Sequence, residues 1–135
     1  MIPIEEKTTF PANWAPRLLS VLRIVVGLLF LAHGIVKLFG FPAGAQPGQV
    51  ALFSIYGLAG VLEFAGGLLI VARLLTRPVA FLLSGEMAFA YFIAHAPVSF
   101  FPGVNGGEAA ILFCFVFLYL AAAGPGPWSL DARSR

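Results

Sequence analysis

The sequence predicts an all-α polytopic membrane protein, a four-transmembrane-helix bundle. Hydrophobic residues make up 60% of the 135 residues, charged residues make up only 10%, and the mean hydropathy is +0.95. These values lie far outside the range of soluble globular domains. A helix needs about 20 apolar residues to cross the hydrocarbon core of a bilayer, so four spans use most of the chain. We therefore expect one domain with short loops, and any activity within the bundle or in a partner protein.

Proline, glycine and polar residues mark the ends of the four predicted spans, which are residues 18–39, 50–72, 78–95 and 108–122. Glycine and proline disfavour continued helix, because glycine is too flexible and proline lacks a backbone N–H. The residues that end the spans are Gly40-Phe41-Pro42, Arg73 to Pro78, Ala96-Pro97 and Gly124-Pro125. Trp14 and Trp128 flank the first and last spans, where indole rings favour the membrane interface. These boundaries divide the chain into an N-terminal tail (1–17), a transmembrane domain (18–123) and a C-terminal tail (124–135).

The distribution of basic residues predicts the orientation of the bundle. The two tails and the middle loop contain six of them: Lys7, Arg17, Arg73, Arg77, Arg133 and Arg135. The loops 41–49 and 96–107 contain no lysine or arginine. Because short cytoplasmic segments of membrane proteins are enriched in lysine and arginine, we expect both termini to be cytoplasmic.

Several ionisable side chains lie inside or at the ends of the predicted spans: Arg23, His33, Lys37, Glu63, Glu86, His95 and Glu108. A charge at the centre of a membrane helix costs about 2.5–3.5 kcal/mol on insertion scales, so such residues join helices or do chemistry. Helical spacing places Arg23 and Lys37 on one glycine-containing face of the first span, and Glu63 on a similar face of the second. We predict that these faces pack together and that Arg23 and Glu63 form a structural ion pair.

Two other ionisable residues have more than one interpretation. Asn105-Gly106-Gly107-Glu108 fits a capping box, with Asn105 as N-cap and Glu108 reaching back to it. Glu86 and His95 are nine residues apart, so they point to opposite faces of a straight helix and can share a pocket only if that helix is distorted. Glu86 could pair with another span, be protonated or face a second subunit.

The predicted orientation brings several polar residues to the outer end of the bundle. His33 and Lys37 lie near the outer end of the first span, His95 near that of the third, and Asn105 and Glu108 at the start of the fourth. We predict a polar site there, with catalytic His33, Lys37, His95 and Glu108, and with substrate bound by His33, Lys37 and Asn105. The alternative is that these histidines are hydrogen-bonded structural residues.

The chain resembles the DoxX family along nearly all of its length after the N-terminal tail. The matching segments are Leu22-Arg23, Ala32-His33-Gly34, Lys37-Leu38-Phe39-Gly40, Glu63 to Leu68, Leu75-Thr76-Arg77, Asn105 to Glu108, Gly124 to Gly126 and Ser129 to Arg133. The resemblance implies a four-helix protein of the bacterial inner membrane. It also implies a link to membrane redox systems such as thiosulfate:quinone oxidoreductase. We expect a soluble redox enzyme or a second membrane subunit as partner, and the chain could also assemble into homo-oligomers.

The residues are compatible with quinone chemistry, because His33, Lys37 and His95 could donate hydrogen bonds, Glu108 could relay protons and phenylalanines could line a slot. Cys114 is the only cysteine, which excludes a pair for disulfide exchange and a cysteine ligand set for an iron–sulfur cluster. A b-type haem between His33 and His95, or a metal ion, is a less favoured cofactor.

The alternative function is a non-catalytic membrane anchor or a small-molecule binding or carrier module for a partner enzyme. No nucleic-acid partner is expected, since the net charge is only +2.

Overall fold

The computed structural model describes residues 12–128, and within this range all regular secondary structure is helical. A short 3₁₀ turn (Ala12–Trp14) leads into α1 (Ala15–Phe39), followed by α2 (Ile55–Ala72) and α3 (Thr76–Ala90). The π-helical segment η2 (Tyr91–His95), the one-turn helix α4 (Pro102–Asn105) and α5 (Glu108–Ala123) complete the described chain. The predictions that involve Lys7, Arg133, Arg135 and residues 129–133 lie outside the described residues.

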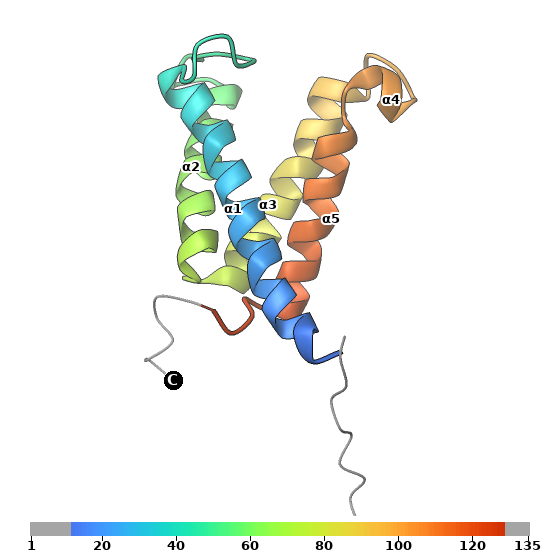
Figure 1. Ribbon diagram of the computed structural model, residues 1–135. Coiled ribbons are helices and arrows are strands. Elements are labelled where there is room, and N and C mark those ends of the chain that lie inside the picture. Colours follow the sequence, from blue (N-terminus) through green and yellow to red (C-terminus); the bar gives the residue numbers. More distant parts are fainter. Residues whose placement is uncertain (1–11, 129–135) are drawn as a thin grey trace, which may run out of the picture.

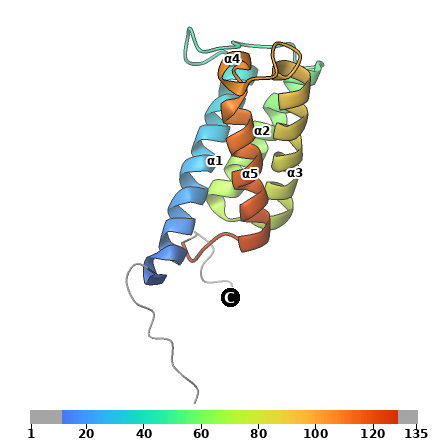
Figure 2. The same ribbon diagram turned by 90° about the vertical axis from the view of Figure 1, so that its right-hand side faces the viewer.

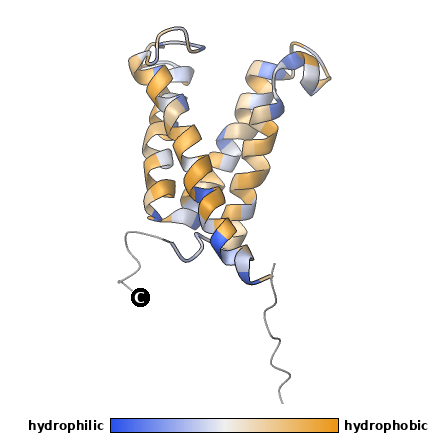
Figure 3. Cartoon of the chain, in the orientation of Figure 1, coloured by the Kyte–Doolittle hydropathy of each residue, from blue (hydrophilic) through white to orange (hydrophobic). Residues whose placement is uncertain are grey.

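The prediction of an all-α membrane protein is confirmed, although the fourth helix is shorter than a typical span. Three helical segments are long and apolar enough to cross a membrane: Ala12–Phe39, Ile55–Ala72 and Thr76–His95. α5 is equally apolar but has 16 residues, which gives about 24 Å of helix against a hydrocarbon core of about 30 Å. Figure 3 shows the predominantly hydrophobic residues along all four long helices.

The four long helices form two packed pairs, α1 with α2 and α3 with α5. The pairs converge at the end where α1 begins and α5 finishes, and they diverge toward the loops at the opposite end (Figure 1). In the view of Figure 2 the long helices run roughly parallel to one another. The molecule is therefore closed at one end and open at the other.

Glycines allow the backbones of α1 and α2 to approach closely. A Cβ atom at Gly34 would lie 2.5 Å from the backbone nitrogen of Phe64, and one at Gly67 would lie 2.7 Å from that of Leu31. Neither position therefore tolerates a side chain without separating the helices. The predicted packing of these two glycine-containing faces is confirmed, and it is the arrangement that membrane helices commonly use to maximise van der Waals contact.

Arg23 is fully buried at the convergent end and hydrogen-bonds four backbone carbonyls. Its Nη1 donates to the oxygens of Ile70 and Val71, each at 2.7 Å. Its Nε donates to Pro125 O at 2.7 Å, and its Nη2 donates to Trp128 O. Ile70 and Val71 lie in the last turn of α2, where the helix dipole favours a cation.

The predicted Arg23–Glu63 ion pair is wrong. Because α1 and α2 are antiparallel, Arg23 is level with the C-terminal end of α2. Glu63 lies seven residues before Ile70, or about 10 Å along a helix, and is therefore out of reach. Helical phase placed both residues on the contact faces but did not fix their relative depth.

Two further contacts close the convergent end. The backbone N–H of Trp128 donates to Ser20 Oγ at 3.0 Å, which fastens the C-terminal segment to α1. Arg77 Nη1, at the start of α3, donates to the carbonyl of Ala122 in the last turn of α5 at 2.8 Å. Above them, Phe30 and Phe117 pack edge to face with ring centroids 4.8 Å apart, and both are buried. The apolar core thus begins directly above this hydrogen-bonded base.

We expect Arg23→Lys to destabilise the bundle although it keeps the charge. A lysine ammonium cannot reproduce the planar arrangement of donors, and losing hydrogen bonds of a charged donor to buried carbonyls costs roughly 1.5–3 kcal/mol each. The midpoint of unfolding in mixed detergent micelles measures the effect. Arg17→Lys is the control, because Arg17 is exposed and its guanidinium lies over the Trp14 ring at 4.9 Å. Equal midpoints for the two variants would contradict the role given to Arg23.

Candidate functional site

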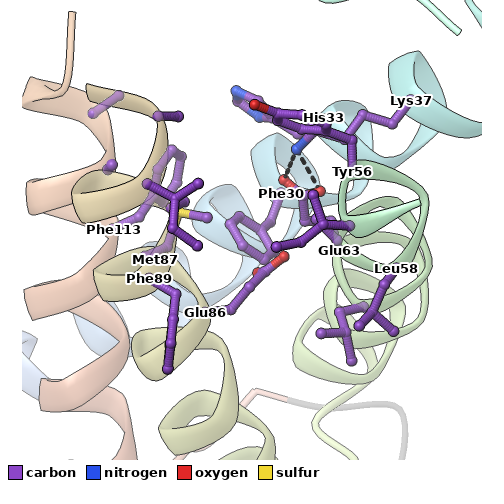
Figure 4. A pocket seen from close by; sticks show the side chains of 18 of the residues that line it. Phe30, His33, Lys37, Tyr56, Leu58, Glu63, Glu86, Met87, Phe89 and Phe113 are labelled. Atoms are coloured by element: carbon purple, nitrogen blue, oxygen red, sulfur yellow. Dashed lines mark hydrogen bonds and ion pairs between the residues drawn. The ribbon is translucent and has the colours of Figure 1, made fainter. Parts of the chain in front are cut away.

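A cleft of about 840 Å³ separates the two helix pairs. Its walls come from α1, α2, α3, η2 and α5, together with Gln46 and Pro47 of the first loop and Gly106. Most lining side chains are apolar, including Phe30, Phe89 and Phe113, which Figure 4 shows around the cleft. The volume lies in the range of small-molecule sites, which are mostly apolar with a few polar groups that orient the ligand.

One ion pair lies in the wall of the cleft, between Lys37 of α1 and Glu63 of α2. Lys37 Nζ is 2.5 Å from Glu63 Oε1 and 2.6 Å from Glu63 Oε2, and the Glu63 side chain is only 1% exposed. The helices can approach this closely because a Cβ at Gly60 would lie 2.9 Å from Lys37 Cβ. The pair neutralises both charges, so Lys37 does not offer an unpaired cation to a ligand.

Glu86 is the second carboxyl group of the cleft. It projects from α3 into the space between the helix pairs (Figure 4). Both carboxyl oxygens are buried, and neither has a hydrogen-bond partner among the described residues. Buried polar groups in proteins are nearly always hydrogen-bonded, so an exception calls for a specific explanation.

The two histidines line the same cleft from opposite helix pairs. His33 Nδ1 is 2.8 Å from Leu29 O, and its ring packs edge to face on Phe113 with centroids 5.8 Å apart. His95 Nδ1 is 2.9 Å from Asn105 O. A carbonyl neighbour favours the tautomer with the proton on Nδ1, which leaves Nε2 of each ring as a hydrogen-bond acceptor.

A π-helical turn brings His95 to the same side of the molecule as Glu86. The segment Tyr91–His95 follows α3 directly, and the N–H of Ala96 donates to Tyr91 O at 2.9 Å, five residues back. A π-helical turn contains more residues than an α-helical one, so the helix phase shifts and residues nine apart no longer oppose each other. Sequence reasoning left Glu86 without a role because no sequence pattern identified this distortion.

Asn105 and Glu108 do not line the cleft, so the structure does not bring their side chains together with those of His33, Lys37 and His95 on its wall. Asn105 is buried and is fully used by neighbouring residues: its Nδ2 donates to Tyr91 Oη and Ser99 O, and its Oδ1 accepts from Gly107 N–H. Glu108 is exposed at the start of α5.

The predicted capping box is also wrong. α5 begins at Glu108 with Gly107 as its N-cap, and no side chain caps it. Asn105 instead ends α4, because Gly106 adopts a left-handed conformation with φ of 73° and stops that helix. One helix ends at Asn105 and the next begins at Glu108. The two residues have the spacing of a capping box, but they do not belong to the start of the same helix.

Within residues 12–128, no three histidine, cysteine, aspartate or glutamate side chains are grouped as metal ligands. The b-type haem considered from the sequence would use Nε2 of His33 and His95, and that cofactor remains an expectation.

Tyr56 also lines the cleft and adds a phenolic hydroxyl from α2 (Figure 4). The sequence predicted no role in the site for Tyr56.

We expect Lys37→Met and Glu63→Leu each to destabilise the protein strongly, because each leaves an uncompensated buried charge at a cost of about 3–5 kcal/mol. The double variant should be more stable than either single variant, since it leaves no charge unpaired. Detergent-induced unfolding of the four proteins gives the coupling energy. The control cycle combines Arg23→Leu with Glu63→Leu and should show no comparable coupling; additive losses at Lys37 and Glu63 would contradict the pairing.

Comparison with known proteins identifies the family. The DoxX family model matches residues 18–96. An uncharacterized protein of Haemophilus influenzae is 42% identical over 125 residues, covering 90% of this chain and 93% of the relative. The Escherichia coli inner membrane protein YqjF is 34% identical over 120 residues, covering 82% of this chain and 87% of the relative. No solved structure matches the chain. Together with the candidate membrane helices, these relatives support a location in the bacterial inner membrane. The chain belongs to the DoxX family of membrane proteins.

Proposed function

We propose that this protein is the integral membrane subunit of a redox system and that its cleft binds a quinone. The observation that carries the proposal is the intramembrane cleft itself, a mostly apolar space of about 840 Å³ with a few polar groups on its walls. A quinone combines an apolar tail with a ring whose oxygens need hydrogen-bond partners. A cleft between membrane helices can receive such a molecule from the bilayer without exposing the tail to water.

The polar groups of the cleft match both oxidation states of a quinone. Tyr56 offers a hydroxyl donor to the carbonyl oxygens of the oxidised ring. The Nε2 atoms of His33 and His95 act as acceptors for the hydroxyl groups of the reduced ring, since carbonyl groups occupy Nδ1 of both residues. A small anion fits the cleft less well, because Glu63 already neutralises Lys37.

Reduction of a quinone to a quinol takes two electrons and two protons. In this proposal the electrons come from a small sulfur compound such as thiosulfate, directly or through a partner redox enzyme. Oxidation of two thiosulfate ions to one tetrathionate releases the two electrons, and the protons come from the solvent through residues of the cleft. With Cys114 as its only cysteine, the chain has no thiol pair to carry two electrons itself.

The lack of a second thiol also supports another candidate, a non-catalytic anchor or carrier. In that case the cleft would hold a lipid-soluble molecule for a partner enzyme and would not participate in its chemistry. The two candidates differ in one observable, because only the redox subunit supports quinone reduction when the sulfur compound is supplied to the purified native complex.

Orientation forms part of the proposal. Arg17 precedes the spanning part of α1, while Arg73 and Arg77 lie in the α2–α3 turn and the first turn of α3, at the convergent end in Figure 1. The positive-inside rule then places this end in the cytoplasm and makes the cleft open toward the outer leaflet.

We therefore expect opposite accessibility of two single cysteines in a Cys114→Ser background. With Ala45→Cys, a membrane-impermeant maleimide should label intact cells. With Leu74→Cys, labelling should require permeabilised cells, because the α2–α3 turn faces the cytoplasm. Labelling of Leu74→Cys in intact cells would reverse the orientation and place the opening of the cleft on the cytoplasmic side.

We expect Ala59→Phe, which adds a ring to the cleft wall, to weaken quinone binding at least tenfold by filling the space. Binding of decylubiquinone to the purified protein in nanodiscs measures this effect. Ala32→Phe is the matched control, because Ala32 is exposed on α1 and does not line the cleft. Unchanged affinity for Ala59→Phe, or equal losses for both variants, would argue against the cleft as the quinone site.

A further inference from the structure

Glu86 is a half-buried residue with a buried carboxyl group, and the packing of the bundle does not explain its presence. Lys37 and Glu63 neutralise each other, and Arg23 satisfies carbonyls at the convergent end. Glu86 has no such use, since neither of its buried oxygens has a hydrogen-bond partner among the described residues. It is also a wall residue of the cleft, into which its side chain projects (Figure 4).

We propose that Glu86 is the ligand-recognition residue of the cleft and that, as a neutral carboxylic acid, it donates a hydrogen bond to a carbonyl oxygen of the bound quinone. This inference rests on the proposed function and extends it, because it assigns the contact with the ligand oxygen to one residue and one chemical form of that residue.

The surroundings of Glu86 favour the neutral acid. An ionised carboxylate in an apolar site is costly unless a cation or several donors compensate it. Besides Glu86, the ionisable groups that line the cleft are His33 and Lys37 of α1, Tyr56 and Glu63 of α2, and His95 of η2, which continues the helix of Glu86. Lys37 is held by both oxygens of Glu63, and Glu63 would repel a second carboxylate.

A neutral carboxylic acid also supplies a hydrogen-bond donor, and few other cleft residues offer one. Both histidines have Nδ1 against a carbonyl and present an acceptor, so Tyr56 is the other donor with a hydroxyl group on the cleft wall. The O–H of a protonated carboxyl is a donor, and an enzyme can use a carboxylic acid kept neutral by an apolar site in this way. A quinone has two carbonyl oxygens, so Glu86 and Tyr56 together provide one donor for each.

The first test compares three proteins in nanodiscs with decylubiquinone as the ligand. Glu86→Gln retains a donor on a side chain of the same size and should bind within about threefold of the unsubstituted protein. Glu86→Leu removes the donor and should bind at least tenfold more weakly. Glu108→Gln is the control on an exposed residue outside the cleft and should leave the affinity unchanged.

Stability separates this role from a structural one. Because Glu86 makes no hydrogen bond within the described protein, Glu86→Leu should fold at least as stably as the unsubstituted protein in detergent-induced unfolding. Infrared spectroscopy tests the chemical form directly. The unsubstituted protein should show the carbonyl stretching band of a protonated carboxylic acid, sensitive to exchange into deuterated water and absent from Glu86→Gln.

The outcomes distinguish this inference from the function on which it rests. If the unsubstituted protein does not bind decylubiquinone, the proposed function fails and the ligand assigned to Glu86 fails with it. If it binds and Glu86→Leu binds equally well, only the inference is overturned. If Glu86→Gln loses affinity as strongly as Glu86→Leu and the acid band is missing, Glu86 acts as a carboxylate, which also overturns the inference.

Discussion

The buried guanidinium of Arg23 connects three parts of the chain that are distant in sequence. It hydrogen-bonds the last turn of α2 through Ile70 and Val71, and the C-terminal segment through Pro125 and Trp128. A charge in this position is tolerable because each of its donors meets a backbone carbonyl, two in the last turn of α2 and two in the segment after α5. With the contact between Arg77 and Ala122, it fixes the helix pairs at one end only. The divergence of the pairs toward the other end, and thus the cleft, depends on this base.

The cleft combines an ion pair whose charges neutralise each other with a carboxyl group that has no hydrogen-bond partner within residues 12–128. Lys37 and Glu63 join α1 to α2, so they maintain one wall of the cleft without presenting charge to its interior. Glu86 stands on the facing wall without such compensation. This difference between the two walls favours a neutral ligand with hydrogen-bonding oxygens over a small anion. We therefore prefer the quinone to the sulfur compound as the occupant of the cleft.

The sequence predicted the helices and their packing faces well, because these follow from apolar length and from the spacing of small residues. Gly34 and Gly67 lie at the α1–α2 contact as expected. Ion pairing was harder to predict, because periodicity gives the face of a helix on which a residue lies but not its depth relative to a neighbouring helix. Glu63 is level with Lys37 and not with Arg23, and it pairs with Lys37. The site prediction included His33, Lys37 and His95, all of which line the cleft. It missed Glu86, because no sequence pattern identified the π-helical turn at Tyr91–His95 that changes the helix phase. It also included Asn105, which does not line the cleft and whose side chain bonds Tyr91, Ser99 and Gly107.

The central claim is that a quinone occupies the cleft between the helix pairs. Photolabelling with an azido-substituted quinone in native membranes, followed by mass-spectrometric mapping of the adducts, tests it most directly. The account predicts adducts on cleft residues such as Tyr56, Phe89 and Phe113, and competition by unlabelled quinone. Adducts spread over exposed residues outside the cleft, such as Leu28 and Phe115, without competition, would contradict it.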